Sequence, residues 1–514
     1  MRTTSRLVTA AVAVTALVLP GSAAGAVPEA VRPGSIAWTP CADDPTAECG
    51  TLSVPLDWAK PAGAKIDLAL ARRKATDPSA RIGSLVINPG GPGGSGVDFA
   101  IFGADYFSPE LRRHFDLVGF DPRGVARSHP VLCSLDLVAQ APSPVLTSQA
   151  DFDRLVAFNR QLGEDCRRNT GALIDHVDTL SVVHDIDAIR AAVGDRKLSY
   201  YGVSYGTLMG QQYAETFPQR VRALALDSNM DHSLGTAGFL FTEAGTAQDS
   251  FNEFVKGCRT DSRCPLFGQD IRALWNDLLA RAARGELNDP FVPGRLLTQL
   301  DLINAAFGSF FGPAWFSLAE YLVVVDAQQP PATSAGTRAQ APELVENSFQ
   351  AVFCQDWRLP MRDFAEYRAL LLVQNLIAPD MRFSPLGLGA AVGCLGWPTP
   401  VNNPQHALRV RGAPKLLLVN ALHDPATGYL WALNAAVQLG DAARLATYEG
   451  WGHGTYGRGD CPTDMMDAYL VSGALPRPGA RCPAVPPEAP ALTAQLKGGL
   501  PMPNGPRPAT PGWG

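Results

Sequence analysis

The sequence lacks the C-x-x-C and H-E-x-x-H spacings that hold structural and catalytic metals, so we expect no metal and no cofactor. Its formal net charge of −6 over 514 residues is small and gives no reason to expect a nucleic-acid partner. No internal repeat is visible. After the first 20 residues, no apolar run approaches the roughly 20 residues that a bilayer span needs, so we expect no membrane span in the mature chain.

The N-terminus has the pattern of a secretory signal. Arg2 and Arg6 precede an apolar run over 7–19, and small residues follow at 24–26. A positive start, a short apolar core and an A-x-A site predict a signal peptide over 1–26. The alternative is a retained membrane anchor, for which the run is short. We therefore expect a secreted, extracellular protein, either free or associated with the cell wall.

Ten cysteines, an even number, follow this export signal. In an exported chain such cysteines favour disulfides over catalytic or metal-binding thiols. The alternative for any one pair is free buried thiols. Proximity in sequence suggests the pairs Cys41–Cys49, Cys133–Cys166, Cys258–Cys264, Cys354–Cys394 and Cys461–Cys482.

Short apolar segments alternate with helical ones in the first half of the chain, which predicts a mainly parallel α/β sheet. A helix is expected over 179–193, where apolar residues recur on one face, and another over 208–217. The expected strands are 84–87, 115–120, 198–201, 221–226, 415–419 and 445–448.

The strand rhythm stops between 231 and 413, where the sequence is helical and loop-like. We interpret 27–230 and 414–482 as two parts of one core and 231–413 as a helical cap inserted between them. Such an insertion commonly covers the carboxyl ends of the strands, where α/β enzymes bind ligands. The segment 483–514, rich in proline, is predicted to be a disordered or surface-bound tail.

Residues 202–206 read Gly-Val-Ser-Tyr-Gly and match G-x-S-x-G. The motif describes a sharp turn from strand to helix that exposes a serine hydroxyl, and glycines are needed there because side chains would collide with backbone. An expected strand precedes the match and an expected helix follows it. Ser204 is therefore the predicted nucleophile of an α/β-hydrolase fold, against the alternative of a structural glycine-rich turn.

A serine nucleophile needs a base, and the base needs an orienting acid. In this fold the chain order is Ser, acid, His, and His453 is the histidine that follows Asp424. His453 lies in a glycine-rich loop after the last expected strand, although a lone loop histidine can also be a surface residue. His423 adjoins Asp424 and would be an awkward partner for it.

Asp424 ends an expected strand, where the acid belongs, although Asp-Pro is also a common turn pair. Asp227 and Asp231, which follow an earlier strand, are reserve candidates for the acid. Thr427, three residues after Asp424, is expected to donate a hydrogen bond to its carboxylate.

The reaction also needs N–H donors for an oxyanion. One is the backbone N–H of Tyr205, next to the nucleophile. The other is expected from the loop 88–96, which carries five glycines and lacks the G-K-[ST] ending of a phosphate loop.

In combination these motifs resemble the proline-iminopeptidase-like serine peptidases, and more closely their secreted tripeptidyl aminopeptidase branch in actinobacteria. Departures are Ala126, where glycine is frequent, and Leu226-Asp227-Ser228-Asn229, where Leu-Asp-Gly is usual. The resemblance spans about 41–482 and rests on 90–93, 121–128, 202–206, 354–357, 394–398, 424–427, 450–453, Cys461, 469–470 and Cys482.

The resemblance implies that Gly91 supplies the second oxyanion N–H. It also implies an exopeptidase that releases short peptides, tripeptides in this branch, from substrates with a free N-terminus. Carboxylates of the cap would then hold the substrate ammonium, since a buried cation requires an anion. Glu243 and Asp356 are the candidates, against the alternative of ordinary salt bridges in the cap.

Two other functions remain open from the sequence. The same triad serves a carboxylesterase or a lipase-like hydrolase, because a fold does not fix the substrate. A non-catalytic cell-surface binding protein on a hydrolase scaffold is the third possibility, although such a scaffold has no need of all three triad residues. We expect a monomer.

Overall fold

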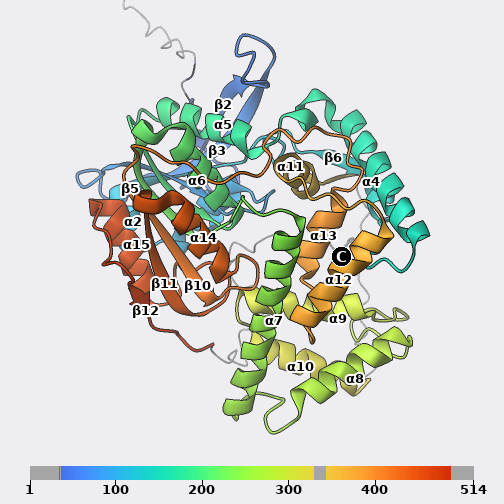
Figure 1. The fold of residues 1–514 in the computed structure, drawn as a ribbon. Helices are drawn as coiled ribbons and strands as arrows, with labels where there is room; N and C mark the ends of the chain where they lie inside the picture. The colour runs from blue at the N-terminus through green and yellow to red at the C-terminus, as the bar shows by residue number, and fades with distance from the viewer. Residues whose placement is uncertain (1–33, 35, 329–342, 488–514) are drawn as a thin grey trace, which may run out of the picture. The chain divides into compact units, whose positions relative to one another are not determined.

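The structure, a computed structural model, describes residues 34, 36–328 and 343–487. It is built on a ten-stranded sheet in the order β1-β2-β3-β5-β4-β7-β8-β10-β11-β12 (Figure 1). The strands are β1 (Thr39–Pro40), β2 (Glu48–Pro55), β3 (Lys65–Arg73), β4 (Gly83–Asn88), β5 (Phe115–Phe120), β7 (Leu198–Val203), β8 (Val221–Asp227), β10 (Leu416–His423), β11 (Ala443–Trp451) and β12 (Arg481–Cys482).

The sheet is antiparallel at one edge and parallel elsewhere. β1, β2, β3 and β5 pair antiparallel, whereas every pairing from β5 through β4, β7, β8, β10 and β11 to β12 is parallel. The central strands β4, β5 and β7 are buried along their whole length. This explains their near-continuous apolar sequences, since a parallel sheet is covered on both faces.

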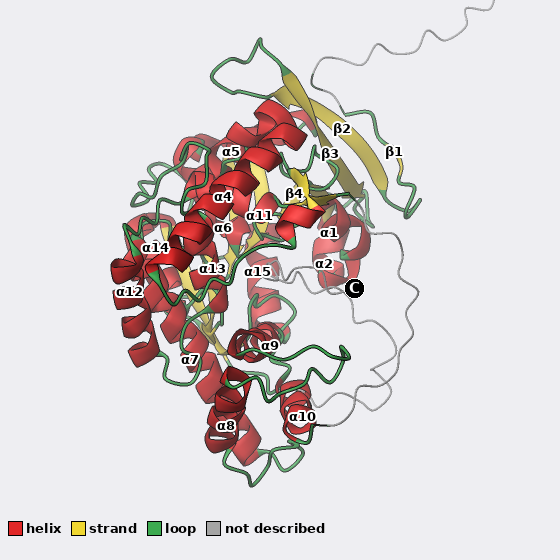
Figure 2. Cartoon of the chain, turned by 90° about the vertical axis from the view of Figure 1, so that its right-hand side faces the viewer, coloured by secondary structure: helices red, strands yellow, loops and turns green. Residues whose placement is uncertain are grey.

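Helices cover both faces of the sheet (Figure 2). Alternate residues of β4 enter different cores: Leu85 and Ile87 pack with α1, α2 and α15, whereas Val86 packs on the side of α5, α6 and α14. These helices are α1 (Gly96–Phe102), α2 (Pro109–His114), α5 (Thr179–Ala192), α6 (Tyr205–Thr216), α14 (Tyr429–Leu439) and α15 (Asp460–Ser472). The predicted strands and helices of this core are confirmed; the antiparallel edge was not predicted.

A run of helices occupies the chain between β8 and β10. The two strands still pair directly, with Leu417 opposite Ala225, so the intervening chain leaves the sheet and returns beside its starting point. These helices are α7 (Thr236–Thr260), α8 (Ile271–Ala283), α9 (Gln299–Phe311), α10 (Trp315–Asp326), α11 (Ser348–Asp356), α12 (Phe364–Ile377) and α13 (Pro385–Gly393).

A small second sheet accompanies this helical region. It pairs β6 (Leu132–Ser134) antiparallel with β9 (Leu344–Glu346), and α3 (Leu135–Val138) and α4 (Gln149–Thr170) follow β6. The predicted signal peptide and tail residues 488–514 lie outside the described residues. None of the helices in the described ranges combines the length and apolar character of a membrane span.

The ten cysteines form disulfides between the pairs predicted from proximity: Cys41–Cys49, Cys133–Cys166, Cys258–Cys264, Cys354–Cys394 and Cys461–Cys482. Two of them tie the helical region internally: Cys258–Cys264 closes the end of α7, and Cys354–Cys394 joins α11 to the end of α13.

Replacing both cysteines of a pair by serine should destabilise the Cys354–Cys394 variant more than the Cys258–Cys264 variant. Their sequence separations are 40 and 6, and a longer closed loop removes more entropy from the unfolded chain. The difference in free energy of unfolding should be about 1–2 kcal/mol, measured by urea denaturation. Equal losses would show that native packing around each bridge outweighs loop entropy.

Candidate active site

Ser204 lies at the sharp turn between β7 and α6. Its backbone has φ 59° and ψ −125°, a conformation that residues other than glycine rarely adopt. Its N–H donates to the carbonyl of Asp227 on β8 at 3.0 Å. A Cβ added to Gly202 would approach the carbonyl of Gly206 to 2.6 Å, so the turn requires glycine at that position.

The glycine-rich loop after β4 lies against this turn. A Cβ on Gly90 would come within 2.4 Å of the Val203 carbonyl and 2.9 Å of the Tyr205 nitrogen. Tyr205 is the first residue of α6, where helix N–H groups have no partner within the helix. Gly91 follows with φ 123°, which a larger residue would rarely adopt. The two predicted oxyanion donors therefore belong to segments in direct contact.

Asp424 and His453 form a buried pair. His453 Nδ1 lies 2.9 Å from Asp424 Oδ1 and 3.1 Å from Oδ2. The parallel pairing of β10 with β11 brings them together, because both residues follow the carboxyl ends of these adjacent strands. The backbone N–H groups of Ala426 and Thr427 donate to Oδ1 at 3.0 Å.

Two hydroxyl groups complete the surroundings of this carboxylate. Thr427 Oγ1 lies 3.1 Å from Asp424 Oδ2, and Ser228 Oγ donates to the same oxygen at 2.6 Å. Burial alone would raise the pKa of Asp424, but the interaction with His453 and these donors outweighs it and holds the pKa below its usual value. Asp424 is therefore an ionised carboxylate that fixes the orientation of the imidazole.

The loop that carries His453 is held against the helical region. The backbone N–H of His453 donates to the carbonyl of Phe311 at 2.9 Å. The Phe311 ring packs edge-on against the imidazole, with the two ring centroids 5.2 Å apart. Arg458 donates to the carbonyls of Phe311, His453 and Gly454. The end of α9 therefore takes part in positioning the imidazole.

His453 Nε2 is buried and has no hydrogen-bond partner among the described residues, Ser204 included. The two segments are nevertheless close: Ser204 N–H binds the Asp227 carbonyl, and Thr455, two residues after His453, donates to the Asp227 carboxylate at 2.8 Å. Catalytic hydrogen bonds are often long without substrate and tighten in the substrate complex. Nε2 is thus the nitrogen available to take the serine proton.

In the part of the chain that the structure describes, neither reserve acid forms a hydrogen bond or an ion pair with His453. Asp227 is buried and receives the N–H groups of Thr455 and Tyr456 and the hydroxyl of Tyr201. Asp231 instead binds side chains of α14, through Asn434 Nδ2 and Gln438 Nε2. Asp227 consequently anchors the histidine loop to β8.

The two candidate amine-binding carboxylates have different surroundings. Asp356 receives Thr179 N–H at 2.8 Å, Thr179 Oγ1, the Tyr205 hydroxyl at 2.6 Å and Asn403 Nδ2 at 2.9 Å, so its oxygens are occupied. These bonds join α11 to α5 and α6. Burial raises the pKa of Asp356 to about 7.

Glu243, on α7, is buried and receives one hydrogen bond from the described residues, from Ser384 Oγ at 2.6 Å. Burial raises its pKa to about 8, and the negative charge of Asp424 adds to this rise. The oxygen that Ser384 does not bind is free to accept from a ligand. Of the two carboxylates, Glu243 is the one with an oxygen available to bind a cation.

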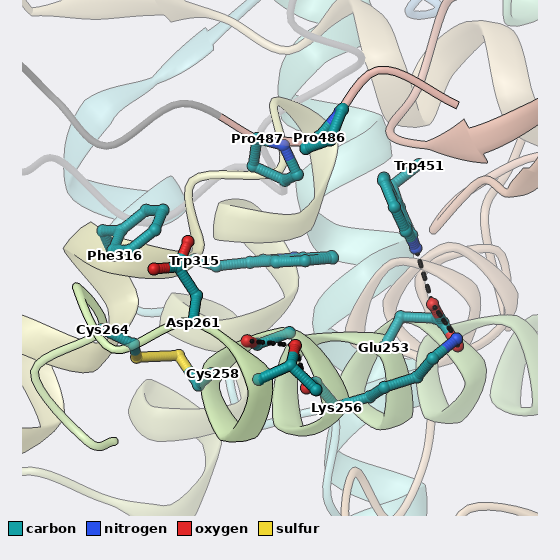
Figure 3. Close-up of a pocket in the computed structure, with 12 residues that line it drawn as sticks. Glu253, Lys256, Cys258, Asp261, Cys264, Trp315, Phe316, Trp451, Pro486 and Pro487 are labelled. Carbon is teal, nitrogen blue, oxygen red and sulfur yellow. Dashed lines mark hydrogen bonds and ion pairs between the residues drawn. A yellow bond between two sulfur atoms is a disulfide. The ribbon is translucent and has the colours of Figure 1, made fainter. Parts of the chain in front are cut away.

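A separate pocket lies between α7, α10 and the end of β11 (Figure 3). Trp315 and Phe316 line it together with Pro486 and Pro487, and Trp451 Nε1 donates to Glu253 at 2.8 Å. Ser204, Asp424 and His453 do not line it. This pocket is therefore distinct from the candidate active site.

Sequence reasoning did not find Ser228, Phe311 or Arg458. Ser228 bore one signal, because it departs from the Leu-Asp-Gly pattern expected from the family resemblance. Phe311 accepts a hydrogen bond through its backbone carbonyl, and the Arg458 side chain donates to backbone carbonyls. Contacts with backbone carbonyls leave no pattern in the sequence.

The fold is that of an α/β-hydrolase, and Ser204, Asp424 and His453 follow neighbouring strands of the sheet in the chain order that serine hydrolases of this fold have. Residues 381–482 match the model of the TAP-like protein family. The chain is 34% identical to the serine protease Hip1 of Mycobacterium tuberculosis, over 93% of this chain and 97% of that protein. It therefore belongs to the TAP-like family of α/β-hydrolase serine peptidases.

Two further relatives carry other names. The tripeptidyl aminopeptidase of Streptomyces lividans is 30% identical, over 88% of this chain and 87% of that protein. Carboxylesterase B of Mycobacterium tuberculosis is 32% identical, over 85% of this chain and 86% of that protein. Relatives named for peptide and for ester substrates are thus similarly distant.

Replacing Asp227 by asparagine should mainly reduce stability, whereas replacing Asp424 by asparagine should mainly reduce turnover. Asp227→Asn turns an amide NH₂ toward backbone N–H donors, so the free energy of unfolding should fall by about 2–4 kcal/mol. Asp424→Asn should lower kcat by about 10⁴-fold with a smaller loss of stability, because the imidazole loses its orienting anion. Urea denaturation and turnover of an activated ester separate the two. A folded Asp424→Asn enzyme of unchanged kcat would contradict the assignment.

Proposed function

We propose that this protein is a secreted serine exopeptidase that releases short peptides, tripeptides foremost, from substrates with a free N-terminus. The observation that carries the proposal is the buried carboxylate of Glu243, which accepts one hydrogen bond among the described residues and is acted on by the charge of Asp424. A carboxylate in this position is costly unless a cation joins it, and a substrate ammonium is such a cation. A neutral ester substrate carries no cation that the Glu243 carboxylate could bind.

In the proposed mechanism Ser204 attacks the peptide carbonyl while His453 Nε2 takes the hydroxyl proton. The oxyanion is bound by the N–H groups of Gly91 and Tyr205, worth about 3 kcal/mol each when well aligned. His453 then protonates the leaving amine, which departs, and an acyl-enzyme remains on Ser204. His453 next activates a water molecule, which hydrolyses the ester and regenerates the serine.

Export is supported by the N-terminal signal pattern and by the five disulfides, since disulfides persist in oxidising environments outside the cytosol. Two relatives named as a serine protease and a tripeptidyl aminopeptidase support peptides as the substrate class.

Tripeptidyl anilides with a free N-terminus should be cleaved at least 100-fold more efficiently, as kcat/KM, than their N-acetylated forms. The reason is that acetylation removes the ammonium that Glu243 would bind. A fluorophosphonate probe should label the wild type, and Ser204→Ala should abolish both labelling and cleavage. Rapid turnover of short p-nitrophenyl esters with no cleavage of any free-amine peptide would instead make the protein an esterase.

Glu243→Gln should raise KM for a free-amine tripeptidyl anilide by about 10–100-fold and leave turnover of a neutral ester nearly unchanged. In the wild type, KM for the peptide should fall as pH rises from 6 toward 8, because Glu243 ionises in this range. Above this range KM should rise again, since an α-amino group loses its proton near pH 7.7–8.0.

In Glu243→Gln the fall of KM between pH 6 and 8 should be absent. Glu320→Gln, an exposed change on α10 of the same helical region, is the matched control and should behave as the wild type. A normal peptide KM in Glu243→Gln would remove Glu243 from the amine site.

A further inference from the structure

Ser228 has a backbone conformation that is strained for any residue with a side chain. It follows β8 directly, is fully buried, and has φ 62°, the left-handed region that favours glycine. A serine held in this conformation is strained relative to glycine unless its side chain gains something in return.

The hydroxyl of Ser228 connects Asp424 to the loop that carries His453. It donates to Asp424 Oδ2 at 2.6 Å and accepts the N–H of Gly454, the residue after His453, at 2.8 Å. The Ser228 N–H in turn donates to the carbonyl of Val419 on β10 at 2.9 Å. One buried side chain therefore fixes the acid and the backbone of the base relative to each other.

The neighbouring residue extends this connection to the nucleophile. The Asp227 carbonyl accepts the Ser204 N–H at 3.0 Å, and its carboxylate accepts the N–H groups of Thr455 and Tyr456. The dipeptide 227–228 thus touches the segments of all three triad residues. Of its two side chains, the Ser228 hydroxyl is the one that reaches the catalytic acid.

We infer that Ser228 is a positioning residue of the catalytic machinery, whose hydroxyl sets the geometry of the Asp424–His453 pair. Without the hydroxyl, Asp424 Oδ2 loses its shortest donor and the Gly454 N–H loses its acceptor, so the imidazole is less firmly aligned toward Ser204. The inference rests on the proposed roles of Ser204, Asp424 and His453, and it is independent of whether the substrate is a peptide or an ester.

Two substitutions separate the hydroxyl from the backbone strain. Ser228→Ala removes the hydroxyl and keeps the strained Cβ, whereas Ser228→Gly removes both and suits the positive φ. Both full-length variants should show kcat lowered by about 10–100-fold with KM changed less than threefold, since misalignment within the triad affects the chemical step. Ser228→Gly should be the more thermally stable of the two.

The low-field proton resonance of the His453 Nδ1–H bond to Asp424 should shift in both variants. Ser250→Ala is the matched control, because Ser250 on α7 is a buried serine whose hydroxyl has no partner among the described residues. Its kcat and its proton resonance should equal those of the wild type.

A fluorophosphonate provides a readout that does not depend on the identity of the substrate. Its second-order rate of reaction with Ser204 should fall in Ser228→Ala and Ser228→Gly in proportion to kcat. Wild-type kcat and labelling rate in Ser228→Gly, or a kcat that follows thermal stability across the two variants, would overturn the inference. Failure of the wild type itself to label or turn over any substrate would overturn the proposed function instead.

Discussion

A single buried negative charge, the carboxylate of Asp424, organises the carboxyl edge of the sheet. An isolated carboxylate could not remain ionised there, because burial disfavours its charged form. The protein supplies Ala426 and Thr427 N–H groups on one oxygen, hydroxyl groups on the other, and His453 across both. These donors come from three segments, the turn after β10, the residue after β8 and the histidine loop after β11, so the need to satisfy one anion fixes the relative positions of these segments.

Parallel strand order is what makes such convergence possible. β7, β8, β10 and β11 are consecutive neighbours in the sheet, although long stretches of chain separate some of them. Their carboxyl ends therefore deliver Ser204, Ser228, Asp424 and the His453 loop to one edge. The helices between β8 and β10 can occupy a long insertion without disturbing this edge, because the strands on either side pair directly.

Much of this arrangement could be read from the sequence, for identifiable reasons. The central strands are recognisable because burial on both faces leaves continuous apolar runs, and the turn at Ser204 is recognisable because close backbone contacts demand glycine. The antiparallel edge was missed because β2 and β3 are only half buried and alternate in polarity, a weaker pattern. Ser228 escaped because neither its positive φ nor its distant partners can be seen in a linear sequence.

The contrast between Asp356 and Glu243 shows why residue type alone could not choose between them. Both are buried acids of the helical region, yet Asp356 already accepts from Thr179, Tyr205 and Asn403. A fifth donor would have to displace one of these bonds and would loosen the residue that follows Ser204. Glu243 accepts from Ser384 on one oxygen, and the charge of Asp424 acts on it as well. In the proposed function, a bound ammonium would compensate the buried charge of Glu243 and its repulsion with Asp424, so these electrostatics would favour a substrate with a charged N-terminus.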